Sequence, residues 1–145
     1  ARRRDRVVAA VRRWIALLIA SSAATAAHAY APETNYTLHC QGCHLEDGAA
    51  SADRVPALAG SVARFLRVPE GRAFLVRVPG SANAPLADAD LAVLLEWMLR
   101  RFDAANVPAD FVPYTAEEVH RLRAEPLVDV APVRRRLLDA IERQH

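Results

Sequence analysis

Two cysteines and a histidine fall within five residues near the amino-terminal end of the chain. Cys40 and Cys43 are separated by two residues, and His44 follows the second cysteine directly. This spacing is typical of c-type haem attachment, in which both thiols bind the ring and the histidine ligates the iron. A disulfide, a redox dithiol and half of a zinc site are the competing interpretations, but zinc would need a second ligand pair. We therefore predict one covalent haem c, with His44 as an axial iron ligand.

Residues on both sides of the motif extend the pattern. Tyr36 lies four residues before the first cysteine, and the segment VPALAG places Pro56, Leu58 and Gly60 after the motif. With these residues the chain resembles the class I cytochrome c family. The resemblance implies a small all-α fold around one haem and a Pro56 carbonyl that orients the ring of His44. It also implies that Leu58 lines the haem pocket.

The resemblance assigns expected roles to two further residues. Arg64 stands four residues past Gly60, where a guanidinium would match a haem propionate, although a solvated arginine is the alternative. Trp97 is expected to meet Tyr36 where the last helix of the haem domain crosses the first. A tryptophan at the rim of the core is the alternative for that residue.

The second axial ligand is missing from the place where the resemblance predicts it. Family members carry a methionine there, often before a proline, whereas this chain has Ala84 before Pro85. Alanine cannot bind iron. Met98 and His120 are the remaining candidates, with core packing and surface exposure as their simpler roles, and the sixth ligand stays unassigned. We expect an iron that is five-coordinate, water-ligated or bound by an external ligand.

Apolar spacing predicts two helices in the haem domain, over residues 69–78 and 88–102. Asp88 is the expected N-cap of the second helix, and Arg100 and Arg101 suit its carboxyl end. The second helix has one narrow apolar stripe, made of Leu91, Leu94, Leu95, Met98 and Phe102. These helices would close the haem domain, which we place at residues 30–102.

Residues 103–145 lie beyond the family pattern and form an extension. We predict helices over residues 115–124 and 132–144, the first opened by a capping box of Thr115 and Glu118. The extension would wrap the haem domain or dock on a partner, and a loosely attached solvated tail is the alternative.

Residues 1–29 read as a secretory signal. Six arginines precede residue 14, an apolar run follows, and Ala27-His28-Ala29 supplies a cleavage pattern. We expect a periplasmic protein with no membrane span in the mature chain, or a membrane-associated one if the segment stays uncleaved. Residues 30–145 carry a net charge of −3, so nucleic acid is not an expected partner.

These expectations converge on electron transfer rather than catalysis. The chain would act as a carrier, or as the haem subunit of a dehydrogenase-type complex, with a dehydrogenase donor or an oxidase acceptor as partner. Two alternatives remain. One is an open-site haem protein for gas sensing or weak peroxidase activity, and the other is a haem-bearing assembly subunit.

Overall fold

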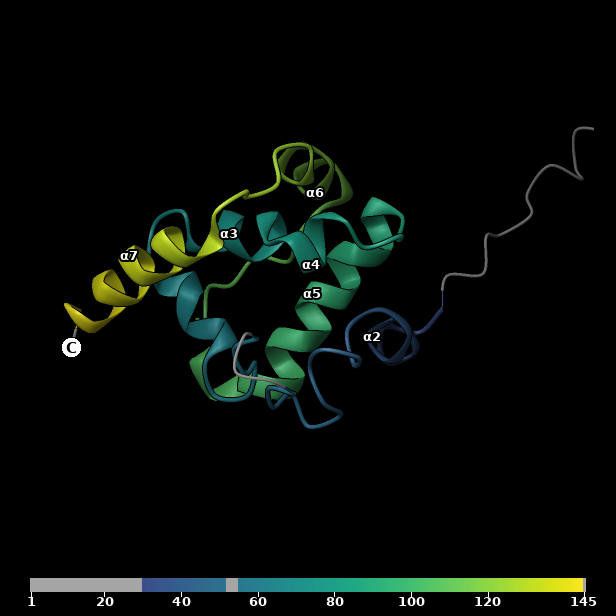
Figure 1. Cartoon of the computed structure of the whole chain (residues 1–145), viewed down its shortest axis with the longest axis horizontal. Coiled ribbons are helices and arrows are strands. Elements are labelled where there is room, and N and C mark those ends of the chain that lie inside the picture. The colour runs from purple at the N-terminus through teal and green to yellow at the C-terminus, as the bar shows by residue number, and fades with distance from the viewer. Residues whose placement is uncertain (1–29, 52–54, 145) are drawn as a thin grey trace, which may run out of the picture.

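The computed structural model describes residues 30–51 and 55–144, and these ranges fold as an all-α protein (Figure 1). No β-strand forms within them, apart from an isolated bridge between His44 and Ala50. The predicted fold class is therefore confirmed. The helices are α2 (Pro32–His39), the 3-10 helix η1 (Val62–Arg67), α3 (Gly71–Arg77), α4 (Pro79–Ala82), α5 (Asp88–Asp103), the 3-10 helix η2 (Ala104–Asn106), α6 (Ala116–Arg123) and α7 (Val130–Glu142).

Helix α5 is the centre of the core. All five residues of its predicted apolar stripe are buried, and Leu94 is completely inaccessible to solvent. Acidic residues occupy the first turn and arginines the last turn, as the helix dipole favours. The predicted N-cap is wrong by one residue, because Ala87 occupies that position and Asp88 is already helical. The Asp88 carboxylate pairs with side chains of α6 instead of capping its own helix.

Helix α2 packs against α5, and aromatic rings fill the contact. The Tyr36 ring lies 5.4 Å from the Trp97 ring and 5.0 Å from the Phe102 ring, measured between centroids. The predicted pairing of Tyr36 with Trp97 is confirmed, and Phe102 adds a third ring. Because α2 leads directly into the Cys40 turn, this contact fixes the start of the candidate site on the core.

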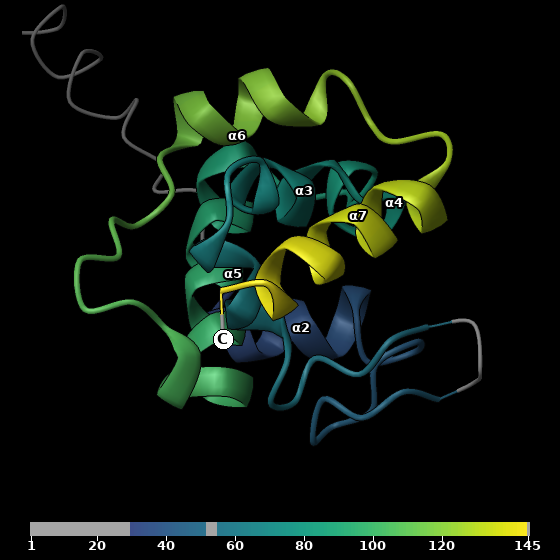
Figure 2. The same cartoon turned by 90° about the vertical axis from the view of Figure 1, so that its left-hand side faces the viewer.

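The predicted extension, residues 103–144 of the described chain, folds back onto the preceding helices. Helix α6 packs against α5, α3 and α4, and α7 packs against η1 (Figure 2). Val119 of α6 and Leu137 and Ile141 of α7 are buried in the common core. The Thr115 hydroxyl accepts a hydrogen bond from the Glu118 N–H at 3.2 Å, which confirms the predicted cap. The solvated-tail alternative is therefore excluded.

Helix α7 begins at Val130, two residues before its predicted start at Pro132. Proline is tolerated there because N–H groups in the first turn of a helix need no helical acceptor. An ion pair of 2.6 Å between Arg136 and Glu70 joins the exposed side of the helix to the turn before α3.

No helix within residues 30–51 and 55–144 is both long and apolar enough to cross a membrane. The predicted secretory signal, residues 1–29, lies outside the described residues.

Candidate haem site

The chain turns tightly as soon as α2 ends. The Cys40 N–H donates to the Tyr36 carbonyl at 2.8 Å, and the N–H groups of Cys43 and His44 both donate to the Cys40 carbonyl, at 3.0 and 2.9 Å. These local bonds bring both thiols and the imidazole onto one short turn. Both cysteines are free, so the disulfide interpretation does not hold in this structure.

Tyr36 links this turn to the core. The residue is 2% exposed, and its hydroxyl shares its one proton between the carbonyls of Leu45 at 2.7 Å and His44 at 3.0 Å. Burial raises the pKa of Tyr36 to about 12, so the hydroxyl keeps its proton as a donor at neutral pH. The aromatic contact between α2 and α5 therefore also sets the position of the His44 backbone.

A second set of backbone bonds ties the Pro56–Gly60 segment to the ligand turn. The Gly48 carbonyl accepts the Leu58 N–H at 2.7 Å, and the Gly60 N–H donates to the Phe102 carbonyl at 3.0 Å. Gly48 has a φ of 78° and lies against the Phe102 ring, where a Cβ atom would come within 2.6 Å of a ring carbon. Glycine is thus required at position 48 by both backbone angle and space.

The His44 ring is half-buried next to this segment. Desolvation lowers the pKa of His44, and this effect is larger than the opposing effect of the Pro56 carbonyl, which raises the pKa. Nδ1 is buried and makes no hydrogen bond of ordinary geometry to any described residue. An imidazole that burial keeps neutral retains the lone pair that ligation of a metal requires.

The two thiols differ in environment. Cys40 is half-buried, and its pKa is raised to about 11, mainly by burial and also by the charge of the neighbouring Cys43 thiolate. Cys43 is exposed. Two uncommitted thiols beside a neutral imidazole are a donor set that fits a c-type haem.

The zinc interpretation gains no support. Among the described residues, no cluster of three or more His, Cys, Asp or Glu side chains is arranged to hold a metal ion.

The other predicted site residues follow the turn along the chain. Leu58 is half-buried and packs against the core, whereas Pro56 is exposed. Arg64 lies half-buried on η1. A propionate contact for Arg64 stays a prediction.

The two candidates for the sixth ligand lie in different surroundings. Met98 is 8% exposed and packs in the hydrophobic core on α5. The side chain of His120 is 79% exposed on α6, with Nδ1 2.9 Å from Asp88 Oδ2. Ala84, which stands where the resemblance predicts a ligand, is buried in the loop between α4 and α5.

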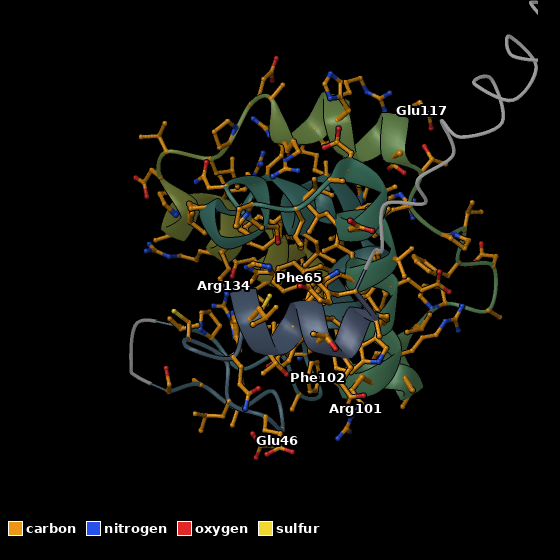
Figure 3. All side chains as sticks on the ribbon, turned by 90° about the vertical axis from the view of Figure 1, so that its right-hand side faces the viewer. Glu46, Phe65, Arg101, Phe102, Glu117 and Arg134 are labelled. Atoms are coloured by element: carbon orange, nitrogen blue, oxygen red, sulfur yellow. The ribbon has the colours of Figure 1, made fainter. Side chains whose placement is uncertain are left out.

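One surface hollow of about 350 Å³ lies beside the ligand turn, lined by Leu45, Glu46, Asp47 and Arg101. Figure 3 shows Glu46 and Arg101 at the same end of the molecule, below Phe102. The two thiols and His44 do not line this hollow, so the fit to haem rests on the thiols and the imidazole of the turn.

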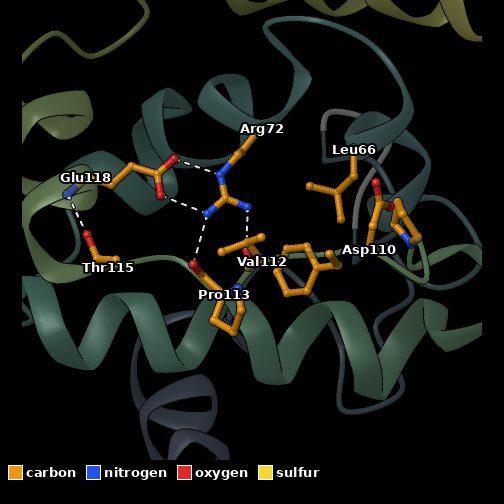
Figure 4. Close-up of a pocket in the computed structure, with 9 residues that line it drawn as sticks. Leu66, Arg72, Asp110, Val112, Pro113, Thr115 and Glu118 are labelled. Carbon is orange, nitrogen blue, oxygen red and sulfur yellow. Dashed lines mark hydrogen bonds and ion pairs between the residues drawn. The ribbon is translucent and has the colours of Figure 1, made fainter.

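A second hollow of about 460 Å³ lies where the extension meets α3 (Figure 4). The Arg72 guanidinium inside it is fully engaged. It makes two bonds of 2.7 Å to the Glu118 carboxylate, donates to the carbonyls of Val112 and Pro113, and lies 4.0 Å from the centroid of the Tyr114 ring. These contacts attach the extension, and they pair the Arg72 charge within the chain.

Two structural residues escaped the sequence analysis. The buried Asp103 carboxylate accepts the Ala63 N–H at 2.8 Å and so closes the start of η1 onto the end of α5. Arg123 of α6 bonds to the loop that contains Ala84. Both contacts join residues about forty positions apart, so no local spacing could have indicated them.

Comparison with known proteins agrees with this geometry. No protein-family model matches the chain. Two cytochromes c-552 of Thermus thermophilus are each 33% identical to it over 106 residues. The matched region spans 61% of this chain, with 81% of the first relative and 72% of the second. With the attachment motif, the all-α fold and the aromatic crossing in place, this similarity shows that the chain belongs to the class I c-type cytochromes.

Proposed function

We propose that the protein is an exported monohaem c-type cytochrome that transfers electrons, either as a carrier or as the haem subunit of a dehydrogenase-type complex. The observation that carries this proposal is the turn from Cys40 to His44. It presents two free thiols and a neutral imidazole on backbone bonds anchored to the core.

Each residue of the turn has a proposed role. Cys40 and Cys43 would hold the haem through thioether bonds, and His44 would ligate the iron through Nε2. The Pro56 carbonyl would accept the Nδ1 proton, which fixes the tautomer and the orientation of the ring. Tyr36 would keep the His44 backbone in place through its hydroxyl. The bound haem supplies one-electron redox chemistry.

Two more residues would tune the site. Leu58 would cover the ring with apolar surface, and Arg64 would pair with a propionate. Burial and paired charge near a haem both shift its reduction potential, so these residues act on the driving force of transfer.

The expected place of work is the periplasm. This part of the proposal rests on the signal-like pattern of residues 1–29 and on the family. A dehydrogenase donor or an oxidase acceptor would be the redox partner.

A second function, binding of a small ligand at an open iron, is favoured by a specific observation. Ala84 cannot ligate iron, Met98 lies in the core, and His120 points to solvent beside Asp88. We propose that the chain supplies no sixth ligand of its own. The site would then admit water, or a diatomic molecule such as CO.

An assembly role has less support. The extension buries the apolar residues of α6 and α7 against its own haem domain, and those residues would otherwise be a docking face.

Visible and EPR spectra of the full, matured protein test both functions. A covalent haem shown by the pyridine haemochrome, with reversible one-electron reduction, is expected. Prompt CO binding to the ferrous form and a high-spin ferric signal would support the open site. A low-spin ferric spectrum with no CO binding would reject it and leave a closed electron carrier, and absence of covalent haem would reject the proposal as a whole.

A further inference from the structure

The Arg123 side chain is unusual in how many groups of one loop it engages. Its Nε donates to the Ala82 carbonyl at 3.0 Å, one Nη donates to the Leu86 carbonyl at 2.8 Å, and the other Nη donates to the Ala84 carbonyl at 2.5 Å. The Asp88 carboxylate completes the set at 3.1 Å. The side chain is only 17% exposed, so these bonds are shielded from water.

These carbonyls lie in a segment that needs outside partners. Helix α4 has only four residues and ends at Ala82, so no further helical turn follows to supply N–H donors to the Ala82 carbonyl. Ala82 and Ala84 are themselves buried, where an unpaired carbonyl would be costly. The Ala84 carbonyl also accepts the Leu86 N–H at 2.8 Å, so Arg123 gives it a second hydrogen bond. A planar guanidinium with five N–H donors can meet three diverging carbonyls and a carboxylate together, whereas a lysine ammonium cannot.

The loop is therefore held from outside by the extension. Helix α6, which carries Arg123, is itself fixed to α3 by the pairing of Arg72 with Glu118 and is capped by Thr115. The Arg123 contacts thus connect a rigid part of the extension to the segment from Ala82 to Asp88.

We propose that Arg123 is a positioning residue that fixes the Ala84 loop at the iron's sixth coordination side, in the place of the bond that a ligating methionine would provide. The inference rests on the proposed function and on the assignment of Ala84 to the second-ligand position. It gives the extension a role at the iron: with the loop fixed by Arg123, its shape does not depend on a bond to the metal.

The test compares Arg123→Gln and Arg123→Lys with Arg77→Gln in the full, haem-loaded protein. Arg77 is the matched control, because it bonds to the Glu125 carbonyl of the extension at 2.7 Å but makes none of the bonds to the Ala84 loop. Amide hydrogen exchange reports the loop, through the N–H groups of Ala84 and Leu86. Titration of the ferric iron with imidazole, followed by its visible spectrum, reports the coordination site.

Both Arg123 variants should speed exchange at these two amides by about tenfold or more, since local opening loses its main restraint. The same variants should change imidazole affinity by at least about threefold, because the free energy of ordering the loop enters the binding equilibrium. Arg77→Gln should match the wild type in both measurements.

Three outcomes would overturn the inference: unchanged exchange in both Arg123 variants, faster exchange with unchanged imidazole affinity, or an equal change in Arg77→Gln. Full rescue by lysine would also overturn it, since one ammonium cannot replace the planar fork. Failure of the proposed function has a different signature, because the wild type itself would then carry no covalent haem. Arg123→Lys, which keeps the charge, provides the measurement if Arg123→Gln does not fold.

Discussion

The ligand turn, residues 40–51, and the extension, residues 103–144, satisfy their polar groups in different ways. The turn is held by backbone hydrogen bonds and by the hydroxyls of Tyr36 and Ser51, while both of its thiols are free. In the extension, Arg72–Glu118 and Arg123–Asp88 pair side chains that lie 46 and 35 positions apart.

This contrast separates binding from support. The two free thiols and the half-buried, neutral His44 imidazole are groups that the chain leaves available to bind another group. The many paired charges of the extension are satisfied within the chain and contribute to the attachment of α6 and α7. We therefore expect changes in the turn to alter haem retention, and changes in the extension to alter stability.

The largest effect should come from Cys40→Ala combined with Cys43→Ala. Removal of both thiols leaves no group that can form a thioether, so covalent haem should be lost completely. Haem staining after denaturing electrophoresis measures this loss. His39→Ala is the matched control, since it removes an exposed neighbour and should leave the haem attached. Covalent haem retained in the double variant would refute the assignment of the motif.

The extension should contribute to the free energy of unfolding, which a loosely attached tail would not do. Ile141 on α7 is completely buried, so Ile141→Ala should lower the free energy of unfolding by about 3 kcal/mol through lost burial and a cavity. Chemical denaturation of the haem-loaded protein measures it. Val128→Ala, at a fully exposed position in the same extension, should change stability by less than about 0.5 kcal/mol. Equal effects of the two substitutions would contradict the contrast.

Tyr36 belongs to both parts of the comparison, because it packs in the core and bonds to the ligand turn. Tyr36→Phe should keep the ring contacts and lose the hydrogen bond that the hydroxyl shares between two carbonyls, at a cost of about 1 kcal/mol. Denaturant titration measures this, and the exposed Tyr30→Phe serves as the control. If Tyr36→Phe left the free energy of unfolding unchanged, the hydroxyl would not hold the turn.

The smallest effect concerns the pairing of Arg72 with Glu118. The hydrogen bond from Arg72 lowers the pKa of Glu118 below its ordinary value of 4.5, so the pair stabilises the fold above that pH. The contribution is lost as pH falls through the lowered pKa, and both side chains are partly exposed, so we expect about 1 kcal/mol.

Glu118→Gln should remove this contribution at pH 7 and flatten the fall of stability below about pH 4.5, as thermal unfolding at several pH values can show. Glu96→Gln, which breaks the exposed pair of Glu96 and Arg100 on α5, is the control and should change stability by about 0.3–0.5 kcal/mol or less. An unchanged pH profile in Glu118→Gln would contradict the role of the pair.

Much of this protein was readable from the sequence, because the relevant signals are local. The spacing of Cys40, Cys43 and His44 fits one turn of chain, and the stripe of α5 follows the helical repeat. The cap of α6 at Thr115 likewise depends on residues three positions apart. The sequence thus determined the turn from Cys40 to His44, the helical class and the order of the main helices.

The tertiary structure alone decided which distant groups meet. Asp88 was predicted to cap its own helix, yet its carboxylate lies between Arg123 and His120 because α6 packs over the start of α5. The buried Asp103 and the bonds of Arg123 to the Ala84 loop also depend on that packing. Contacts of this kind are set by which apolar faces bury one another, and the spacing along a chain does not encode where those faces bring the polar groups.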